Sequence, residues 1–346
     1  SFSSFAGNPY FIDLETLVQE GMLTEEECEA CDFGDDPNRI DYGKIYEQRF
    51  SLLHLAYERS NIAKNPEFIS FTQENADWLE DYALFMAVKL RFEGAAWDEW
   101  AEDIRKRWSN ALDYYRRECY FDIEFYKYLQ FQFHVQWTKL KEYANENGIQ
   151  FIGDIPIYVA FDSADAWANP EMFQFDEDYR PTAVAGCPPD AFSATGQLWG
   201  NPLYKWDYHT RTNFHWWCRR LEHCFKLYDV VRIDHFRGFD EYYSIPFGAE
   251  TAINGHWEKG PGMELFRALK SRLGDKAIIA EDLGFLTDSV VQLLKDSGYP
   301  GMKVLEFAFD PREETDYLPH SYDRNCVVYT GTHDNETLVQ WWKGLD

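Results

Sequence analysis

The chain has 346 residues and carries 60 acidic against 33 basic side chains, a formal net charge of −27. This excess of negative charge argues against nucleic acids and anionic membrane surfaces as partners, because both attract proteins rich in lysine and arginine. Seven scattered cysteines do not form the pattern of a disulfide framework, and no apolar run reaches the length of a membrane span, so we expect a cytoplasmic protein.

The first half of the chain, from about residue 13 to 147, predicts helices. In segments such as DWLEDYALFMAVKLRFEG, apolar residues recur three and four positions apart between charged ones, which is the periodicity of an amphipathic helix. Asn147 and Gly148 then provide the usual signal for the end of a helix. This half therefore contributes few strands.

The second half predicts strands that alternate with helices. Amphipathic stretches such as MELFRALKSRLG separate several short apolar runs, an order typical of a parallel sheet. The interval from about residue 155 to 207 is much longer than the others and includes AVAGCPPDAFSATGQLWGNPLYKW, which is typical of a functional loop. The predicted strands are Ile149 to Gly153, Val230 to Asp234, Ala277 to Glu281, Lys303 to Phe307 and Val327 to Thr330.

Each predicted strand ends next to a carboxylate, in the sequences GDIP, RIDH, AEDLG, EFAFD and GTHDN. The carboxyl ends of parallel strands meet at one face of the fold, where the chemistry of α/β proteins collects. A single strand-end Asp is also a common helix cap. Five crowded carboxylates repel one another, however, and such a cluster indicates a function.

Three classes of enzyme cluster acids in this way: metal-dependent hydrolases, enzymes that bind phosphate through magnesium, and enzymes that act on glycosides. His235 and His333 could be metal ligands in principle. The sequence lacks an H-E-x-x-H motif and a Gly-rich phosphate loop, so we expect neither a metal site nor a cofactor.

Glycoside chemistry needs one protonated and one ionised carboxyl group. Arg232 and Asp234 are two positions apart, so their side chains share one side of a strand, and the cation favours an ionised Asp234 as nucleophile. Glu281 follows the apolar run AIIA, a setting that raises a carboxyl pKa and retains a proton. The alternatives are a structural ion pair for Arg232 and Asp234, and a helix cap for Glu281.

Several long motifs resemble those of glycoside hydrolase family 77, the 4-alpha-glucanotransferases known as amylomaltases or disproportionating enzymes. These motifs are RIDHFRGFDEYYSIP, AEDLG, THDNET, GDIPIYV, the loop GCPPDAFSATGQLWGNPLYKW and the opening SFSSFAGNPYFIDLE. The resemblance implies a (β/α)8 barrel of the alpha-amylase clan with inserted, largely helical subdomains. Residues 1–346 would form a single catalytic domain, with an inserted subdomain within 13–147 and an insertion at about 155–207 that contains the active-site loop 185–205.

The resemblance also implies a role for individual residues. Asp234 in RIDHFRG would be the nucleophile, Glu281 in AEDLG the general acid/base, and Asp334 in THDNET the third acid, which in this clan binds sugar hydroxyls. Family members often have an aromatic residue where this chain has Ala191, so a contact tied to that aromatic is not implied here. The residues implied to bind substrate are Arg232, His235, Asp282, His333, Asp190, Phe192, Gln197, Trp199, Asn201 and Asp154.

The family pattern extends beyond both ends of this sequence, and we expect the first and last parts of the barrel to be missing from it. The implied activity is transfer of an α-1,4-glucan segment from a maltooligosaccharide donor to the 4-OH of an acceptor glucan or glucose, by retaining double displacement. The competing interpretations are an α-glucan hydrolase or debranching relative, and a non-catalytic glucan-binding protein. The intact set of three acids argues against the last.

Overall fold

The computed structural model describes residues 1–36, 38–190, 193–284, 286–309 and 317–345. These residues form two compact units, which are described separately. The first comprises Ser1–Gly148 and Ala160–Pro170, and the second Ile149–Val159 and Glu171–Asp346. Within the described residues, no helix is both long and apolar enough to cross a membrane.

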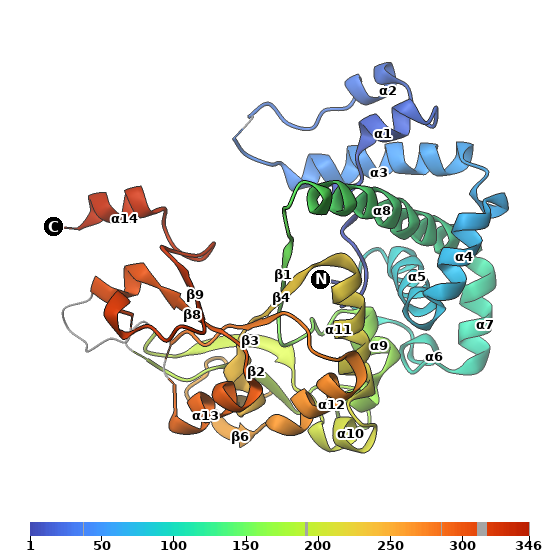
Figure 1. The fold of residues 1–346 in the computed structure, drawn as a ribbon. Helices are drawn as coiled ribbons and strands as arrows, with labels where there is room; N and C mark the ends of the chain where they lie inside the picture. The colour runs from blue at the N-terminus through green and yellow to red at the C-terminus, as the bar shows by residue number, and fades with distance from the viewer. Residues whose placement is uncertain (37, 191–192, 285, 310–316, 346) are drawn as a thin grey trace. The chain divides into compact units, whose positions relative to one another are not determined.

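The first unit is helical. Its central element is the long helix α8 (Tyr120–Glu146), which packs against α3 (Tyr42–Arg59), α4 (Pro66–Glu74) and α5 (Ala76–Arg91) (Figure 1). The remaining elements are η1 (Pro9–Phe11), α1 (Leu14–Gln19), α2 (Glu25–Glu29), η2 (Ile62–Lys64), η3 (Trp97–Glu99), α6 (Glu102–Arg105), α7 (Ser109–Glu118) and α9 (Ala164–Ala168).

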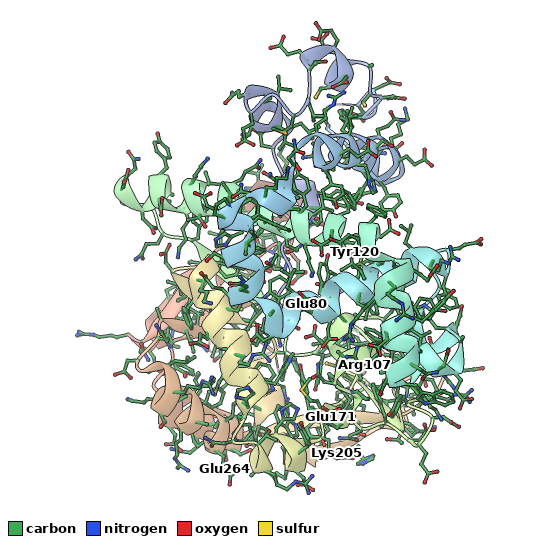
Figure 2. The ribbon with its side chains drawn as sticks, turned by 90° about the vertical axis from the view of Figure 1, so that its right-hand side faces the viewer. Glu80, Arg107, Tyr120, Glu171, Lys205 and Glu264 are labelled. Atoms are coloured by element: carbon green, nitrogen blue, oxygen red, sulfur yellow. The ribbon has the colours of Figure 1, made fainter. Side chains whose placement is uncertain are left out.

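Aromatic side chains and ion pairs hold these helices together. Trp97 and Trp167 are fully buried, and the indole N–H of Trp167 donates to the carbonyl of Ile104 at 3.1 Å. Glu80 on α5, labelled in Figure 2, pairs with Lys127 of α8 at 2.7 Å. Much of the chain's aromatic content therefore serves as a core.

The second unit contains the parallel strands that the sequence predicts. β1 (Ile152–Ile155), β4 (Val230–Ile233) and β7 (Ile278–Ala280) form one parallel sheet, and β8 (Gly301–Val304) pairs in parallel with β9 (Cys326–Tyr329). The N–H of Ala280 donates to the carbonyl of Pro300 at 2.9 Å, so β8 continues the sheet beyond β7. The mixed helix and strand content confirms the predicted α/β class.

The strand β4 has two different sides. The buried side chains Val231 and Ile233 alternate along it with Arg232, which confirms the predicted division of this strand into two sides.

Helices and short turns connect the strands of this unit. They are η4 (Pro170–Met172), α10 (Trp206–Arg211), α11 (His215–Leu227), η5 (Phe236–Phe239), α12 (Met263–Leu273), α13 (Asp288–Ser297), η6 (Leu305–Phe309), η7 (Pro319–Ser321) and α14 (Leu338–Gly344).

Two predicted strands need correction. The strand predicted at Ile149 to Gly153 lies at Ile152–Ile155, and the strand predicted at Lys303 to Phe307 ends at Val304, where a 3-10 helix follows at once. The structure also contains an antiparallel sheet that the sequence does not predict, in which the strand order is β3 (Gln197–Pro202), β2 (Ala183–Cys187), β5 (Glu241–Pro246) and β6 (His256–Lys259). Its central strands β2 and β5 are about sixty residues apart in the sequence, so no local sequence pattern predicts that they pair.

Candidate active site

The predicted carboxylates of the first two parallel strands meet at one guanidinium. Asp154 and Arg232 are direct neighbours in the register of β1 and β4, so their side chains share a face. Arg232 Nη1 lies 2.6 Å from Asp154 Oδ1 and 3.2 Å from Asp234 Oδ1, and Arg232 Nε donates to Met302 Sδ at 3.1 Å. The Arg232 guanidinium group thus connects β1, β4 and β8 next to the Asp234 carboxylate.

Asp234 follows β4, where solvent and Arg232 both reach it. Burial raises the pKa of its carboxyl group, the Arg232 charge opposes this, and the charges of Asp154 and Asp334 raise it further. The expectation that Arg232 alone would dominate is therefore too simple. The side chain nevertheless keeps 46% of its surface exposed, and the adjacent guanidinium favours the ionised form.

Glu281 follows β7 in a different environment. Both of its carboxyl oxygens accept backbone hydrogen bonds: Oε2 from the N–H of His235 at 2.8 Å and Oε1 from the N–H of Leu283 at 2.6 Å. Burial raises the pKa of Glu281, these two donors oppose the rise, and the Asp234 charge adds to it. The pKa of both acids is therefore raised, and the two differ in their partners, a guanidinium beside Asp234 and two backbone N–H groups at Glu281.

Aromatic rings pack around His235, which directly follows Asp234. The centroid of the His235 ring lies 4.9 Å from that of Trp199, in an edge-to-face arrangement, and 6.5 Å from that of Tyr158. Burial lowers the pKa of His235 to about 4, so its imidazole is neutral near pH 7. Trp199 remains 38% exposed, and its indole N–H donates to Gln197 Oε1 at 3.0 Å.

Asp282 has a different environment from its neighbour Glu281. Its side chain is buried, and Oδ1 accepts the N–H of Met302 at 2.7 Å. A Cβ added to Gly301 would lie 2.6 Å from the Asp282 carboxylate, so glycine is needed at that position for the contact. Asp282 thus holds β8 against β7, and the structure does not bring it to the exposed rim with Asp234.

Most of the remaining predicted residues have contacts of their own. Asp334 and His333 follow β9, are both exposed and lie 3.5 Å apart, from Oδ2 to Nε2. Asn201 Nδ2 donates to the carbonyl of Val159 at 2.9 Å, and Asp190 Oδ1 accepts the N–H of Ser193 at 2.7 Å. Phe192, together with the neighbouring Ala191, lies outside the described residues.

Sequence reasoning missed the backbone donors of His235 and Leu283, the sulfur of Met302 and the ring of Tyr158. The thioether of Met302 and the ring of Tyr158 carry no local signal of a polar site. Among the residues described, no group of three or more His, Cys, Asp or Glu side chains could hold a metal ion.

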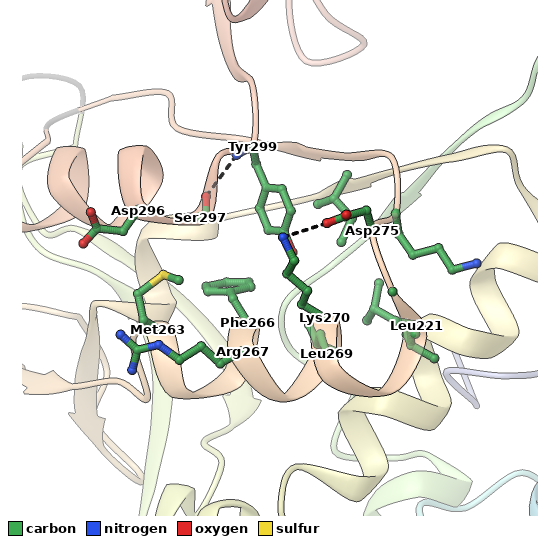
Figure 3. Close-up of a pocket in the computed structure, with 14 residues that line it drawn as sticks. Leu221, Met263, Phe266, Arg267, Leu269, Lys270, Asp275, Asp296, Ser297 and Tyr299 are labelled. Carbon is green, nitrogen blue, oxygen red and sulfur yellow. Dashed lines mark hydrogen bonds and ion pairs between the residues drawn. The ribbon is translucent and has the colours of Figure 1, made fainter.

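A separate cavity lies at the opposite ends of the strands. It has a volume of about 130 Å³ and is lined by residues that include Phe266 of α12, Ile278 at the start of β7 and Tyr299 before β8 (Figure 3). Lys270 and Asp275 pair across its rim at 2.9 Å. Because it opens at the amino ends of β7 and β8, it is not part of the carboxylate site.

Comparison with known proteins gives consistent matches over the whole chain. A family model described as 4-alpha-glucanotransferase matches residues 1–345. The 4-alpha-glucanotransferase of Clostridium butyricum is 48% identical over 344 residues, which cover 99% of this chain and 71% of that protein. The 4-alpha-glucanotransferase of Streptococcus pneumoniae TIGR4 is 50% identical over 345 residues, covering 99% of this chain and 68% of that protein.

Solved structures agree. The amylomaltase from Streptococcus agalactiae in complex with acarbose superposes with a TM-score of 0.96 at 43% identity, covering 100% of this chain and 70% of that one. The amylomaltase from Corynebacterium glutamicum gives a TM-score of 0.78 at 20% identity, which shows a shared fold.

Proposed function

This chain belongs to the 4-alpha-glucanotransferase family, whose members transfer glucan segments, and we propose that Asp234 and Glu281 carry out this transfer by a retaining double displacement. One observation carries the assignment. At neighbouring strand ends, Asp234 is exposed beside a guanidinium that favours its ionised form, while both carboxyl oxygens of Glu281 accept backbone hydrogen bonds in a setting that raises its pKa, as burial also does for Asp234. Retaining transfer needs one ionised and one protonated carboxyl group, and the guanidinium contact favours Asp234 as the ionised one.

The first step breaks the glycosidic bond of a maltooligosaccharide donor. The Asp234 carboxylate attacks the anomeric carbon and forms a glycosyl ester, while Glu281 gives its proton to the departing 4-oxygen. Glu281 is then a carboxylate, which the N–H groups of His235 and Leu283 stabilise.

The second step transfers the glucan to an acceptor. Glu281 removes the proton from the 4-OH of an acceptor glucan or glucose, and that oxygen displaces Asp234 from the anomeric carbon. Two inversions retain the α configuration. All the steps use carboxyl groups of this chain, so the proposed reaction needs no cofactor.

The remaining predicted residues would bind the sugar. We assign Asp334 as the third acid, which binds sugar hydroxyls with His333, and Trp199 as an apolar face for a sugar ring beside His235. Arg232 and Asp154 would keep Asp234 in place. Asp190, Gln197 and Asn201 lie on or beside the predicted loop 185–205 and stay candidates for substrate contacts, as do Phe192 and Asp282.

Architecture and compartment follow as further proposals. The five parallel strands β1, β4, β7, β8 and β9 lie side by side in chain order, which supports their being successive strands of a (β/α)8 barrel. We also propose that the helical unit contains the inserted subdomain of one catalytic domain, residues 1–346. Seven free cysteines support a reducing, cytoplasmic location.

The two acid assignments are tested with two donors. Maltotriose has a poor leaving group that needs proton donation, whereas α-maltosyl fluoride releases fluoride without it. Asp234→Asn should be inactive on both donors. Glu281→Gln should be inactive on maltotriose but should react with the fluoride and accumulate a maltosyl adduct on the peptide that contains Asp234.

Mass spectrometry of the digested protein locates the adduct, and circular dichroism confirms that both variants are folded. An adduct on another residue, or substantial turnover of maltotriose by Asp234→Asn, would overturn the assignment of the nucleophile.

A further inference from the structure

The turn that follows β4 has a conformation that is uncommon for residues other than glycine. His235 has φ 55° and ψ 48°, in the left-handed region where residues with a Cβ are disfavoured. It comes directly after Asp234, the proposed nucleophile. Strained backbone of this kind persists where surrounding structure maintains it, and it often marks a functional constraint.

The consequence of the turn is seen in the hydrogen bonds to one residue, Glu281. Its N–H donates to the carbonyl of Ile233 at 3.0 Å, as strand pairing requires. Beyond the strand, the N–H of His235 donates to Glu281 Oε2 at 2.8 Å, and the N–H of Phe236 donates to the Glu281 carbonyl at 3.0 Å. Successive N–H groups of an extended strand point in opposite directions, so only a turn aims both at the same residue.

The side chain of His235 packs beside the turn. Its ring packs against the edge of Trp199 and lies near Tyr158. Gly238 leaves room for it, because a Cβ at that position would lie 3.1 Å from His235 Cδ2 and 2.8 Å from Ile157 Cδ1. The ring thus fits a space that residue 238 does not fill.

We propose that the left-handed turn at His235 is a positioning device, which aims the peptide N–H between Asp234 and His235 at the Glu281 carboxylate. This peptide is covalently part of the nucleophile's own backbone, so it fixes the acid/base group relative to the attacking group. His235 is therefore a positioning residue that acts through its backbone. The inference rests on the proposed function, since it assumes that Glu281 is the acid/base.

The same hydrogen bond supports the proton transfer. An N–H donor stabilises the charged carboxylate and lowers its pKa, which opposes the effect of burial. When Glu281 gives up its proton, the donor is already in place and needs no reorganisation. Loss of the bond would leave the charged form less stable and Glu281 a weaker acid.

The test separates the turn from the imidazole. His235→Gly removes the ring but allows positive φ, whereas His235→Val opposes it strongly, because a β-branched residue is an outlier there. Both variants are compared with wild type for the pH dependence of kcat/KM on maltotriose. The basic limb of that profile reports deprotonation of Glu281 in the free enzyme.

We expect His235→Val to lower kcat/KM at least about tenfold and to move the basic limb to higher pH. His235→Gly should lower kcat/KM less and leave the basic limb where wild type has it. An equal displacement of the limb in both variants would show that the ring is responsible, and an unmoved limb in a folded His235→Val would refute the positioning role. If His235→Val does not fold, His235→Ala replaces it, since Ala and Gly differ only in the Cβ that opposes the turn.

Glu281→Gln separates this inference from the proposed function. If that variant keeps maltotriose turnover with an unchanged basic limb, the assignment of Glu281 itself fails. If it is inactive while His235→Val leaves the limb unmoved, only the positioning role fails.

Discussion

At the scale of single residues, Arg232 determines how the two acids of the site differ. Its guanidinium contacts Asp234 and Asp154, while the hydrogen bonds to the Glu281 carboxylate from the described residues come from the backbone N–H groups of His235 and Leu283. Burial raises the pKa of both Asp234 and Glu281, and for Asp234 the adjacent cation opposes that rise. A nucleophile must be ionised at the pH of the reaction, so this cation extends the usable pH range downward.

Removal of the cation should therefore change the acidic limb of the pH profile. In Arg232→Met the pKa of Asp234 should rise, and the acidic limb of kcat/KM should move to higher pH. We expect a fall in kcat/KM of about a hundredfold at neutral pH, because the carboxylate also loses its orientation. Arg232→Lys retains the positive charge but cannot contact both Asp154 and Asp234 in the same way. Its acidic limb should therefore lie close to that of wild type, while its kcat/KM stays reduced. An acidic limb that does not move in Arg232→Met would show that Arg232 does not control Asp234.

The sequence carries much of this residue-level information. A two-residue spacing on a strand places Arg232 and Asp234 on the same side, and the apolar run before Glu281 indicates a raised pKa. The backbone donors that hold Glu281 could not be predicted in this way. They depend on the dihedral angles of His235, and no residue type specifies a left-handed conformation there as glycine would.

At the scale of elements, local periodicity predicts what local contacts determine. Each of the five parallel strands overlaps a short apolar run in the sequence, although the first run, Ile149 to Gly153, is displaced from β1. The antiparallel sheet was missed because its strands carry mixed side chains, as in HWEK of β6, and pair over long separations in the chain. The end of β8 was misplaced because Leu305 and Phe307 continue the apolar pattern into a 3-10 helix.

A buried histidine in helix α10 should make the stability of the protein depend on pH. His209 is fully buried among aromatic rings, with Nε2 3.2 Å from the carbonyl of Met172. Burial lowers its pKa from 6.5 to about 4. The contribution of neutral His209 to the free energy of unfolding is fully present above pH 6.5 and is lost as the pH falls toward 4. In that range, the imidazole binds a proton in the unfolded chain but not in the folded one.

Urea unfolding at pH 7 and pH 5 measures this effect. Between these values, the free energy of unfolding of His209→Gln should fall by about 2 kcal/mol less than that of wild type. Because each protein is compared with itself at the two pH values, any pH-independent loss of stability caused by the substitution cancels. Equal losses in the two proteins would show that His209 is not held neutral by the fold.

At the scale of the whole molecule, the family match extends over the part of the chain that holds the acids. The family model covers residues 1–345, and the site lies wholly within the second unit. The formal charge of −27 does not oppose binding of a neutral glucan, although it would repel phosphate-bearing partners. In the proposed reaction, the fate of the glycosyl ester decides between transfer and hydrolysis, since a sugar hydroxyl and water compete for it.

The most direct test of the central claim is the product balance from maltotriose. The chain should convert maltotriose into glucose and a ladder of longer maltooligosaccharides while the total of reducing ends stays constant, because every bond broken is matched by one formed. Chromatography of the products together with a reducing-sugar assay measures both quantities. Reducing ends that rise in step with the loss of maltotriose, with no product longer than the substrate, would contradict the assignment of this chain as a glucanotransferase.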